Sequence, residues 1–176
     1  AVLGINDYLF LDGYEELLKE QEENGRLGNL TLLPVVEFRI EKFAGVDFGA
    51  LKRINFHVIF SNELTVETIR SQFLNTLEQS YQLDNGSAWT RAITMESVAE
   101  LGAQIKASSP KGKCPTGSDL TVGFSNLNVK EDQICKALNK DCFKGKFLIA
   151  VGKTEWADRK WTEASIATKK SIINSA

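Results

Sequence analysis

The sequence predicts an α/β fold with mostly parallel strands, on two observations. Segments with the composition of strands alternate with segments of helical periodicity, which is the order of strand–helix–strand units. Two strand segments, residues 54–60 (INFHVIF) and 147–151 (FLIAV), are apolar on both faces, as expected for a sheet covered by helices. With 176 residues, 43% of them hydrophobic, and no evident linker, the chain is predicted to form one domain over residues 1–176.

The first part of the chain has the pattern of a strand, a helix and a second strand. Residues 1–5 are apolar and predict a short buried strand. Asp12 and Glu15 have the spacing of a capping box, which predicts that a helix begins there and ends before Gly25. β-Branched and aromatic side chains then predict a strand over residues 32–40.

The middle of the chain predicts two helices. Thr65 is placed to cap the first, in which apolar side chains recur at spacings of three and four. These side chains are Val66, Ile69, Phe73 and Leu77. Asn85 and Gly86 interrupt the chain, and a second helix is predicted over residues 94–106.

The last part of the chain begins with an exposed loop over residues 108–118, which is rich in proline, glycine and serine. A short apolar stretch follows at residues 120–124, and a helix is predicted near residues 130–139. After the strand at 147–151, a final helix is predicted from about Thr162.

Composition excludes several classes of protein. The net charge of −2 gives no long-range attraction to a polyanion, and no apolar run approaches the roughly 18 residues that a membrane-spanning helix needs. The N-terminus has no cationic region before its apolar stretch, so a cytoplasmic location is expected. Ala1 opens on a strand-like run and Ala176 lies inside a helical pattern, which predicts that the chain is a piece of a longer one.

Three ionisable residues are candidates for a site. His57 is the only histidine and lies near the carboxyl end of an apolar strand, where α/β folds gather ligands; the alternative is a core histidine bonded to a carbonyl. Glu37 lies inside an apolar strand and needs a partner, either a metal ion or a salt bridge to Arg39 or Lys42. Asp7 follows the first strand, where it is either a site acid or a turn residue.

Other features suggest nucleic-acid binding or exclude particular chemistries. Lys111 and Lys113 lie in the predicted loop and are candidate phosphate contacts, although the loop does not match a P-loop. Trp156 and Trp161 flank a charged stretch that is typical of a stacking surface for nucleic acid, or of ordinary packing. No GxSxG motif occurs, which disfavours an acyl-transfer hydrolase.

Three stretches, GINDYLFLDGYEELL, LPVVEFRI and INFHVIFS, resemble successive parts of a PHP domain, the polymerase and histidinol phosphatase family of metal-dependent phosphoesterases. The later stretch FLIAVGKTEWADRKW is similar to the PHP-like portion of large ATPase proteins. The resemblance implies a distorted (β/α)7 barrel, present here incompletely. It also implies a phosphoesterase acting on nucleic acid or nucleotides with an ATPase module of the same longer protein, in DNA repair or phage defence.

The resemblance also implies roles for the three candidates. Glu37 would bridge divalent metal ions (Mn, Zn or Fe), His57 would ligate one, and Asp7 would ligate or orient a bound water. Tyr8 stands where the family has histidine, and no HxH motif occurs. An alternative is therefore a non-catalytic descendant of the fold that contacts an ATPase or DNA. A third hypothesis is simple nucleic-acid binding through the loop of Lys111 and Lys113 and the region of Trp156.

Overall fold

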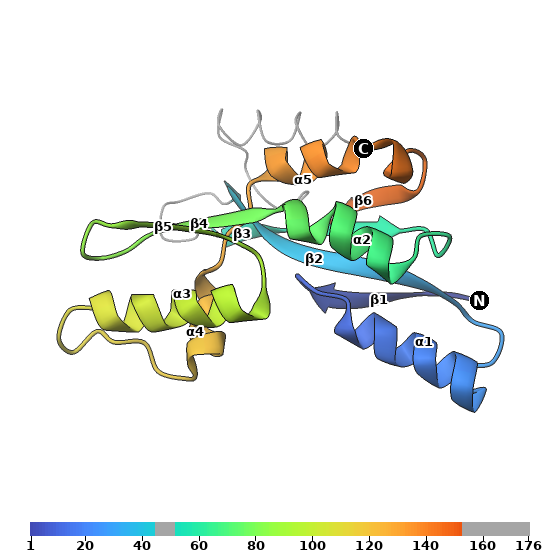
Figure 1. Ribbon diagram of the computed structural model, residues 1–176, viewed down its shortest axis with the longest axis horizontal. Coiled ribbons are helices and arrows are strands. Elements are labelled where there is room, and N and C mark those ends of the chain that lie inside the picture. Colours follow the sequence, from blue (N-terminus) through green and yellow to red (C-terminus); the bar gives the residue numbers. More distant parts are fainter. Residues whose placement is uncertain (45–51, 153–176) are drawn as a thin grey trace.

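The computed structural model describes residues 1–44 and 52–152, which form one hydrophobic core around a four-stranded sheet (Figure 1). The strands lie in the order β1-β2-β3-β6. Their bounds are Val2–Tyr8 for β1, Thr31–Ala44 for β2, Lys52–Phe60 for β3 and Phe147–Val151 for β6. The four predicted strands are thus confirmed as strands, and β1, β2 and β3 are longer than expected. The prediction that the first and last strands are buried is wrong, because β1 is mostly exposed and Leu148 of β6 is 68% exposed.

The predicted mostly parallel barrel is wrong. Only β1 and β2 are parallel, whereas β2–β3 and β3–β6 are antiparallel, and the described strands form an open sheet. The physical reason lies in the connection between β2 and β3. Residues 45–51 alone separate them, and a parallel crossover needs about a dozen residues or more.

Helices and aromatic side chains cover one face of this sheet. Strand side chains at alternate positions on β2 and β3 are fully buried there. Phe73 lies against rings from β2, from β3 and from the segment before β6, with ring centroids 5.1 to 6.1 Å apart. The covering elements are α1 (Asp12–Asn24), α2 (Val66–Gln72), α5 (Glu131–Leu138) and the short 3-10 helices η2 (Leu74–Thr76) and η3 (Asp141–Phe143).

A hairpin and two helices form the part of the molecule farthest from α1 (Figure 1). The hairpin strands are β4 (Glu78–Gln82) and β5 (Ala88–Ala92), and the helices are α3 (Met95–Ser108) and α4 (Asp119–Asn126). The sequence interpretation missed the hairpin, although Asn85-Gly86 between two polar-apolar stretches is a hairpin turn signal. The apolar stretch at 120–124 belongs to α4, so it is helical.

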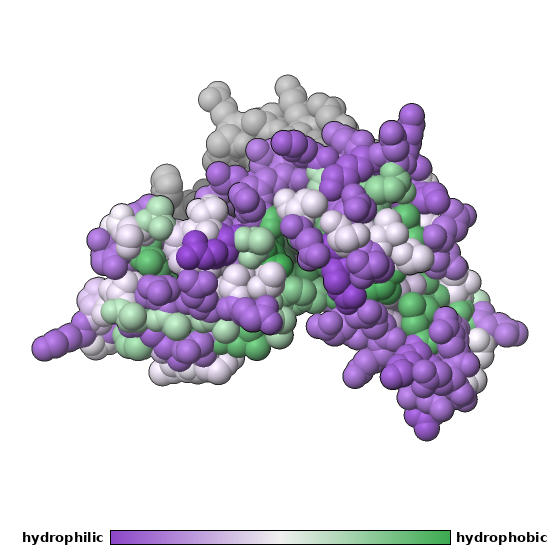
Figure 2. Space-filling view, in the orientation of Figure 1, coloured by the Kyte–Doolittle hydropathy of each residue, from purple (hydrophilic) through white to green (hydrophobic). Residues whose placement is uncertain are grey.

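The predicted helices at Thr65 and Thr94 are confirmed, and both begin as expected, but the first is shorter than predicted, because α2 ends at Gln72 and Leu77 lies beyond η2. The side chain of each threonine accepts a hydrogen bond from the backbone N–H of the third residue of its helix. This N–H has no hydrogen-bond partner within the helix itself. The helix predicted from Thr162 lies outside the described residues. Figure 2 shows the surface of α1 as strongly hydrophilic, in keeping with its many glutamates. No described helix combines the length and apolar character needed to span a membrane.

Candidate functional site

Glu37 and His57 are brought together by the pairing of β2 with β3. The two residues are directly opposite in the antiparallel register, so their side chains project from the same face of the sheet. Glu37 Oε2 lies 3.4 Å from His57 Nε2, and the side chains are 19% and 26% exposed. The neighbours on either side, Val36 and Val58, are fully buried on the opposite face. The pair therefore lies on the face away from the aromatic core.

Strand β1 adds two polar side chains to this face. Asn6 Nδ2 donates a hydrogen bond of 2.8 Å to Glu37 Oε2, which orients the carboxylate. Tyr8 of β1 is half-buried and is the register partner of Glu37 in the parallel pairing of β1 with β2. The hydroxyl of Tyr8 donates to the carbonyl of Phe124 at 3.4 Å, and its ring packs on the ring of Phe124. Three strands thus contribute to one polar cluster.

Two arginines lie beside the same cluster. The Cζ atom of Arg39 is 5.5 Å from the centroid of the Tyr8 ring, and Arg53 Nη1 donates to the carbonyl of Leu127 at 3.2 Å. Burial raises the pKa of Tyr8, while the positive charges of Arg39 and Arg53 act to lower it. Within the described residues no salt bridge joins Arg39 to Glu37, so that alternative for Glu37 is wrong, and the side chain of Lys42, the other possible partner, lies outside what the structure describes. The interpretation of the sequence considered Arg39 only as a salt-bridge partner of Glu37.

Asp7 lies on the other face of the sheet and is not brought to Glu37 and His57. Its register partner is Val36, which is fully buried against the core. Asp7 Oδ2 accepts a hydrogen bond of 2.9 Å from the N–H of Tyr14 in the first turn of α1. A Cβ atom on Gly13 would lie 2.5 Å from Asp7 Oδ1, so glycine makes this approach possible.

The capping of α1 therefore differs from the prediction. The N-cap residue is Leu11, whose side chain makes no capping bond, and Asp12 is already the first helical residue. The predicted Asp12–Glu15 capping box is wrong because Asp7, from the preceding strand, supplies the acceptor instead. Its carboxylate also lies at the positive end of the helix dipole, which favours it there.

Replacing Asp7 with asparagine is expected to change how stability depends on pH. Burial raises the pKa of Asp7 above its ordinary 3.8, although hydrogen bonds from the N–H groups of Tyr14 and Gly13 oppose this. Folding then favours the protonated acid. The free energy of unfolding of the wild type should therefore fall relative to Asp7→Asn as the pH rises from below 3.8 through the raised pKa.

Urea denaturation of both proteins across that pH range measures the effect. Asp7→Ala serves as the control, because it loses the acceptor for Tyr14 altogether and should cost about 1 kcal/mol. A wild type that gains stability over Asp7→Asn with rising pH would show that the interaction of the carboxylate with the helix N-terminus outweighs its burial.

The remaining candidates lie away from this cluster. Lys111 and Lys113 are exposed and belong to the loop between α3 and α4. Figure 1 shows this loop on the side of the molecule away from β1. Trp156 and Trp161 lie outside the described residues. Within residues 1–44 and 52–152 no three His, Cys, Asp or Glu side chains are grouped so that they could hold a metal ion.

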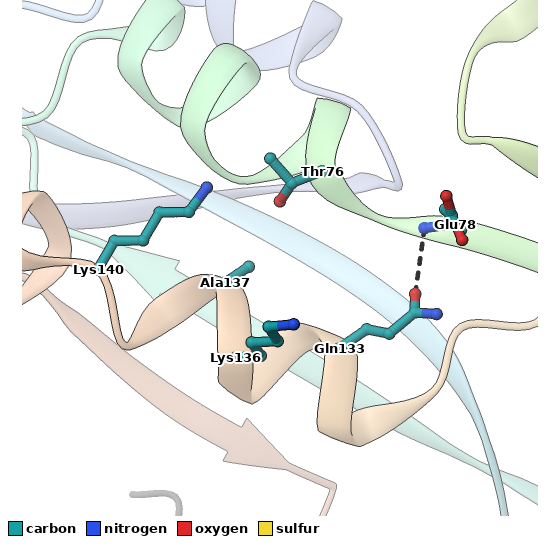
Figure 3. Close-up of a pocket in the computed structure, with 6 residues that line it drawn as sticks. All are labelled: Thr76, Glu78, Gln133, Lys136, Ala137 and Lys140. Atoms are coloured by element: carbon teal, nitrogen blue, oxygen red, sulfur yellow. Dashed lines mark hydrogen bonds between the residues drawn. The ribbon is translucent and has the colours of Figure 1, made fainter.

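A hollow of about 550 Å³ lies elsewhere, between α5 and the segment of η2 and β4 (Figure 3). Gln133 Oε1 accepts a hydrogen bond of 3.1 Å from the N–H of Glu78 across it. The lining residues are Thr76, Glu78, Gln133, Lys136, Ala137 and Lys140. None of the site residues predicted from the sequence lines this hollow, and two lysines with one carboxylate are a poor set of metal ligands. The sheet face carries the richer chemistry.

The chain matches no family model, no curated protein and no solved structure. The likeness to PHP domains therefore depends on the quoted sequence stretches alone.

Proposed function

We propose that this chain is part of a metal-dependent phosphoesterase in which Glu37 and His57 hold a divalent cation. The observation that carries the proposal is the distance of 3.4 Å between Glu37 Oε2 and His57 Nε2 on one half-buried sheet face. A carboxylate and an imidazole are ligands that Zn, Mn and Fe share. Two guanidinium groups nearby supply the positive charge that a phosphate ester requires.

The distance between the two ligand atoms suits a shared cation better than a direct bond. A charge-assisted hydrogen bond between nitrogen and a carboxylate oxygen is about 2.7 to 2.9 Å long. Two ligands of a tetrahedral zinc ion, each about 2.1 Å from the metal, are about 3.4 Å apart. Because the described residues contain no group of three ligands, the coordination would need water or further side chains.

When bound, the cation would supply an activated water and neutralise charge on the phosphate. Asn6 would keep Glu37 Oε2 in place, since it donates to that oxygen. Nucleic acid or nucleotides as substrate and an ATPase module in the same longer protein belong to the proposal through the resemblance to PHP domains. A cytoplasmic location belongs to it through the N-terminal sequence, which has no cationic region before its apolar stretch. Asp7 is left out of the proposed site, because it caps α1.

The single histidine makes the test direct. The imidazole signals in a ¹H–¹⁵N spectrum come from His57 alone, so a Zn²⁺ titration should shift them in a saturable manner. In Glu37→Gln the shift should need about tenfold more Zn²⁺ or more, because the anionic ligand is lost. Glu63→Gln is the matched control, since Glu63 is an exposed carboxylate paired with Lys146.

The outcome decides the proposal. His57 signals that ignore Zn²⁺ in the folded protein, or that respond equally in Glu37→Gln, would contradict a cation at this pair. Where binding is seen, phosphodiesterase activity with Mn²⁺ that is lost in both Glu37→Gln and His57→Gln would support catalysis.

A second candidate function is a non-catalytic module that contacts an ATPase or DNA. The absence of a third ligand among the described residues favours it, as does Tyr8 at the position where PHP domains have histidine. This candidate predicts a folded protein that binds no cation. If the loop of Lys111 and Lys113 contacts DNA, binding should weaken steeply with salt and should weaken further in the double Lys→Gln variant.

A further inference from the structure

Arg39 is an exposed cation on the same sheet face as Glu37. The two residues are two positions apart on β2, so their side chains project from the same side, with Cα atoms about 6.6 Å apart. In the part of the chain that the structure describes, no carboxylate lies within salt-bridge distance of Arg39. The contact described for its guanidinium group is with the ring of Tyr8.

The ring of Tyr8 limits where the guanidinium group of Arg39 can lie. At 5.5 Å from the ring centroid, the guanidinium carbon is within range of a cation–π attraction, and this attraction does not use the N–H groups as hydrogen-bond donors to the ring. Tyr8 is itself held by the carbonyl and the ring of Phe124, so α4 fixes the position of the ring that Arg39 contacts. A guanidinium group held in this way is suited to bidentate binding of a phosphate.

The backbone next to Tyr8 also indicates a functional position. Leu9 has a φ of +69°, a left-handed conformation that costs a side-chain-bearing residue about 1 kcal/mol, and Leu9 is fully buried. Its N–H donates to the carbonyl of Glu37 at 3.1 Å. Leu9 therefore links the backbones of two residues of the cluster. It follows Tyr8, whose ring contacts Arg39, and it is hydrogen-bonded to Glu37, which belongs to the proposed cation site.

We infer that Arg39, held on the ring of Tyr8, binds the phosphoryl oxygens of the substrate beside the Glu37–His57 pair. The inference deepens the proposed function and depends on it for the reaction, but anion binding by Arg39 can be measured separately. Arg53 adds a second positive charge, and an N–H group at its Nη1 donates a hydrogen bond to the carbonyl of Leu127. The ligand class is a phosphate ester.

Calorimetric titration with inorganic phosphate, without added metal, tests the inference. Arg39→Gln should weaken phosphate binding about tenfold or more, because a charge-assisted hydrogen-bonded pair is lost. Tyr8→Leu, which removes the ring, should bind phosphate several-fold more weakly than the wild type, and Tyr8→Phe, which keeps the ring but loses the hydrogen bond to the carbonyl of Phe124, should weaken binding less. The double variant Lys111→Gln, Lys113→Gln is the control for charge alone. Circular dichroism confirms that each variant is folded.

Each outcome of the phosphate titrations either supports or contradicts the role of Arg39. No binding of millimolar phosphate by the wild type, or equal binding by Arg39→Gln, overturns the inference. Equal weakening in Arg39→Gln and in the double lysine variant also overturns it, because it indicates an unspecific charge effect. Arg39-dependent phosphate binding combined with His57 signals that ignore Zn²⁺ would uphold this inference and reject the proposed function.

Discussion

Replacing Gly123 with alanine is expected to destabilise the protein by about 3 kcal/mol. Gly123 of α4 lies against the backbone of α3, where an added Cβ atom would stand 2.8 Å from the carbonyl carbon of Val98 and closer still to its oxygen. Gly102 makes the reciprocal approach from α3, 2.6 Å from the carbonyl carbon of Asp119. Since the obstructing atoms are backbone, a rotamer change cannot relieve the clash.

The sign of this effect is informative because helix propensity acts in the opposite direction. Alanine in a helix interior is favoured over glycine by about 1 kcal/mol, so an unpacked α4 would become more stable. Gly112→Ala is the control: it has a φ of +82° but open space around it, and it should cost only the backbone strain of about 1 kcal/mol. Urea denaturation followed by circular dichroism gives all three stabilities. A Gly123→Ala protein as stable as the wild type would show that α3 and α4 do not pack in this way.

Replacing Phe73 with alanine is expected to cost about 3 to 5 kcal/mol. Phe73 is fully buried, and its ring makes edge contacts with Phe38, Phe60 and Phe143, at centroid distances of 5.8, 5.1 and 6.1 Å. Truncation removes these contacts and leaves a cavity that the three surrounding elements, β2, β3 and η3, cannot all close.

Leu148→Ala is the comparison for Phe73→Ala, because Leu148 is a large apolar residue that is 68% exposed. Its loss should change the free energy of unfolding by no more than about 0.5 kcal/mol. Thermal and urea unfolding of both variants give the two values. If Phe73→Ala cost no more than Leu148→Ala, the aromatic cluster could not be the centre of the core.

The aromatic cluster also matters for the candidate site, because it fixes the register of β2. Side chains alternate between the two faces of a strand, so a slip by one residue would move Glu37 into the core and Phe38 to the polar face. The burial of Phe38 against Phe73 opposes that slip. A weakened core should therefore also disturb the alignment of Glu37 with His57.

Local elements of this fold could be predicted from sequence, but the pairing of its strands was predicted wrongly. Thr65 and Thr94 mark helix starts because a hydroxyl at an N-cap is a local signal that needs no tertiary partner. Strand direction depends on the length of the connections, and the short separation of β2 and β3 was available in the sequence. Glu37 and His57 are nearly equidistant from that connection, so antiparallel pairing would have placed them side by side.

The position of Asp7 could not be predicted in the same way. Which face it occupies depends on the register between β1 and β2, and those strands are joined through a whole helix. A shift of one residue would have placed Asp7 beside Glu37 and Tyr8 beside the core. The proposed role of Arg39 was missed for a different reason, because a cation two residues from a carboxylate on one strand was considered only as a possible salt-bridge partner of that carboxylate.

The pairing of β3 with β6 has a consequence for how the chain acquires its structure. Residues 61–146 lie between these neighbouring strands, so closing the sheet carries a large entropic cost and should be a late, slow event. During synthesis on the ribosome, β3 has an unpaired edge until β6 emerges. The sequence of β6, FLIAV, is uncharged and strongly β-prone, a composition typical of segments that self-associate when unpaired. The two strands shield each other, and the nascent chain is most exposed to aggregation in the interval before they meet.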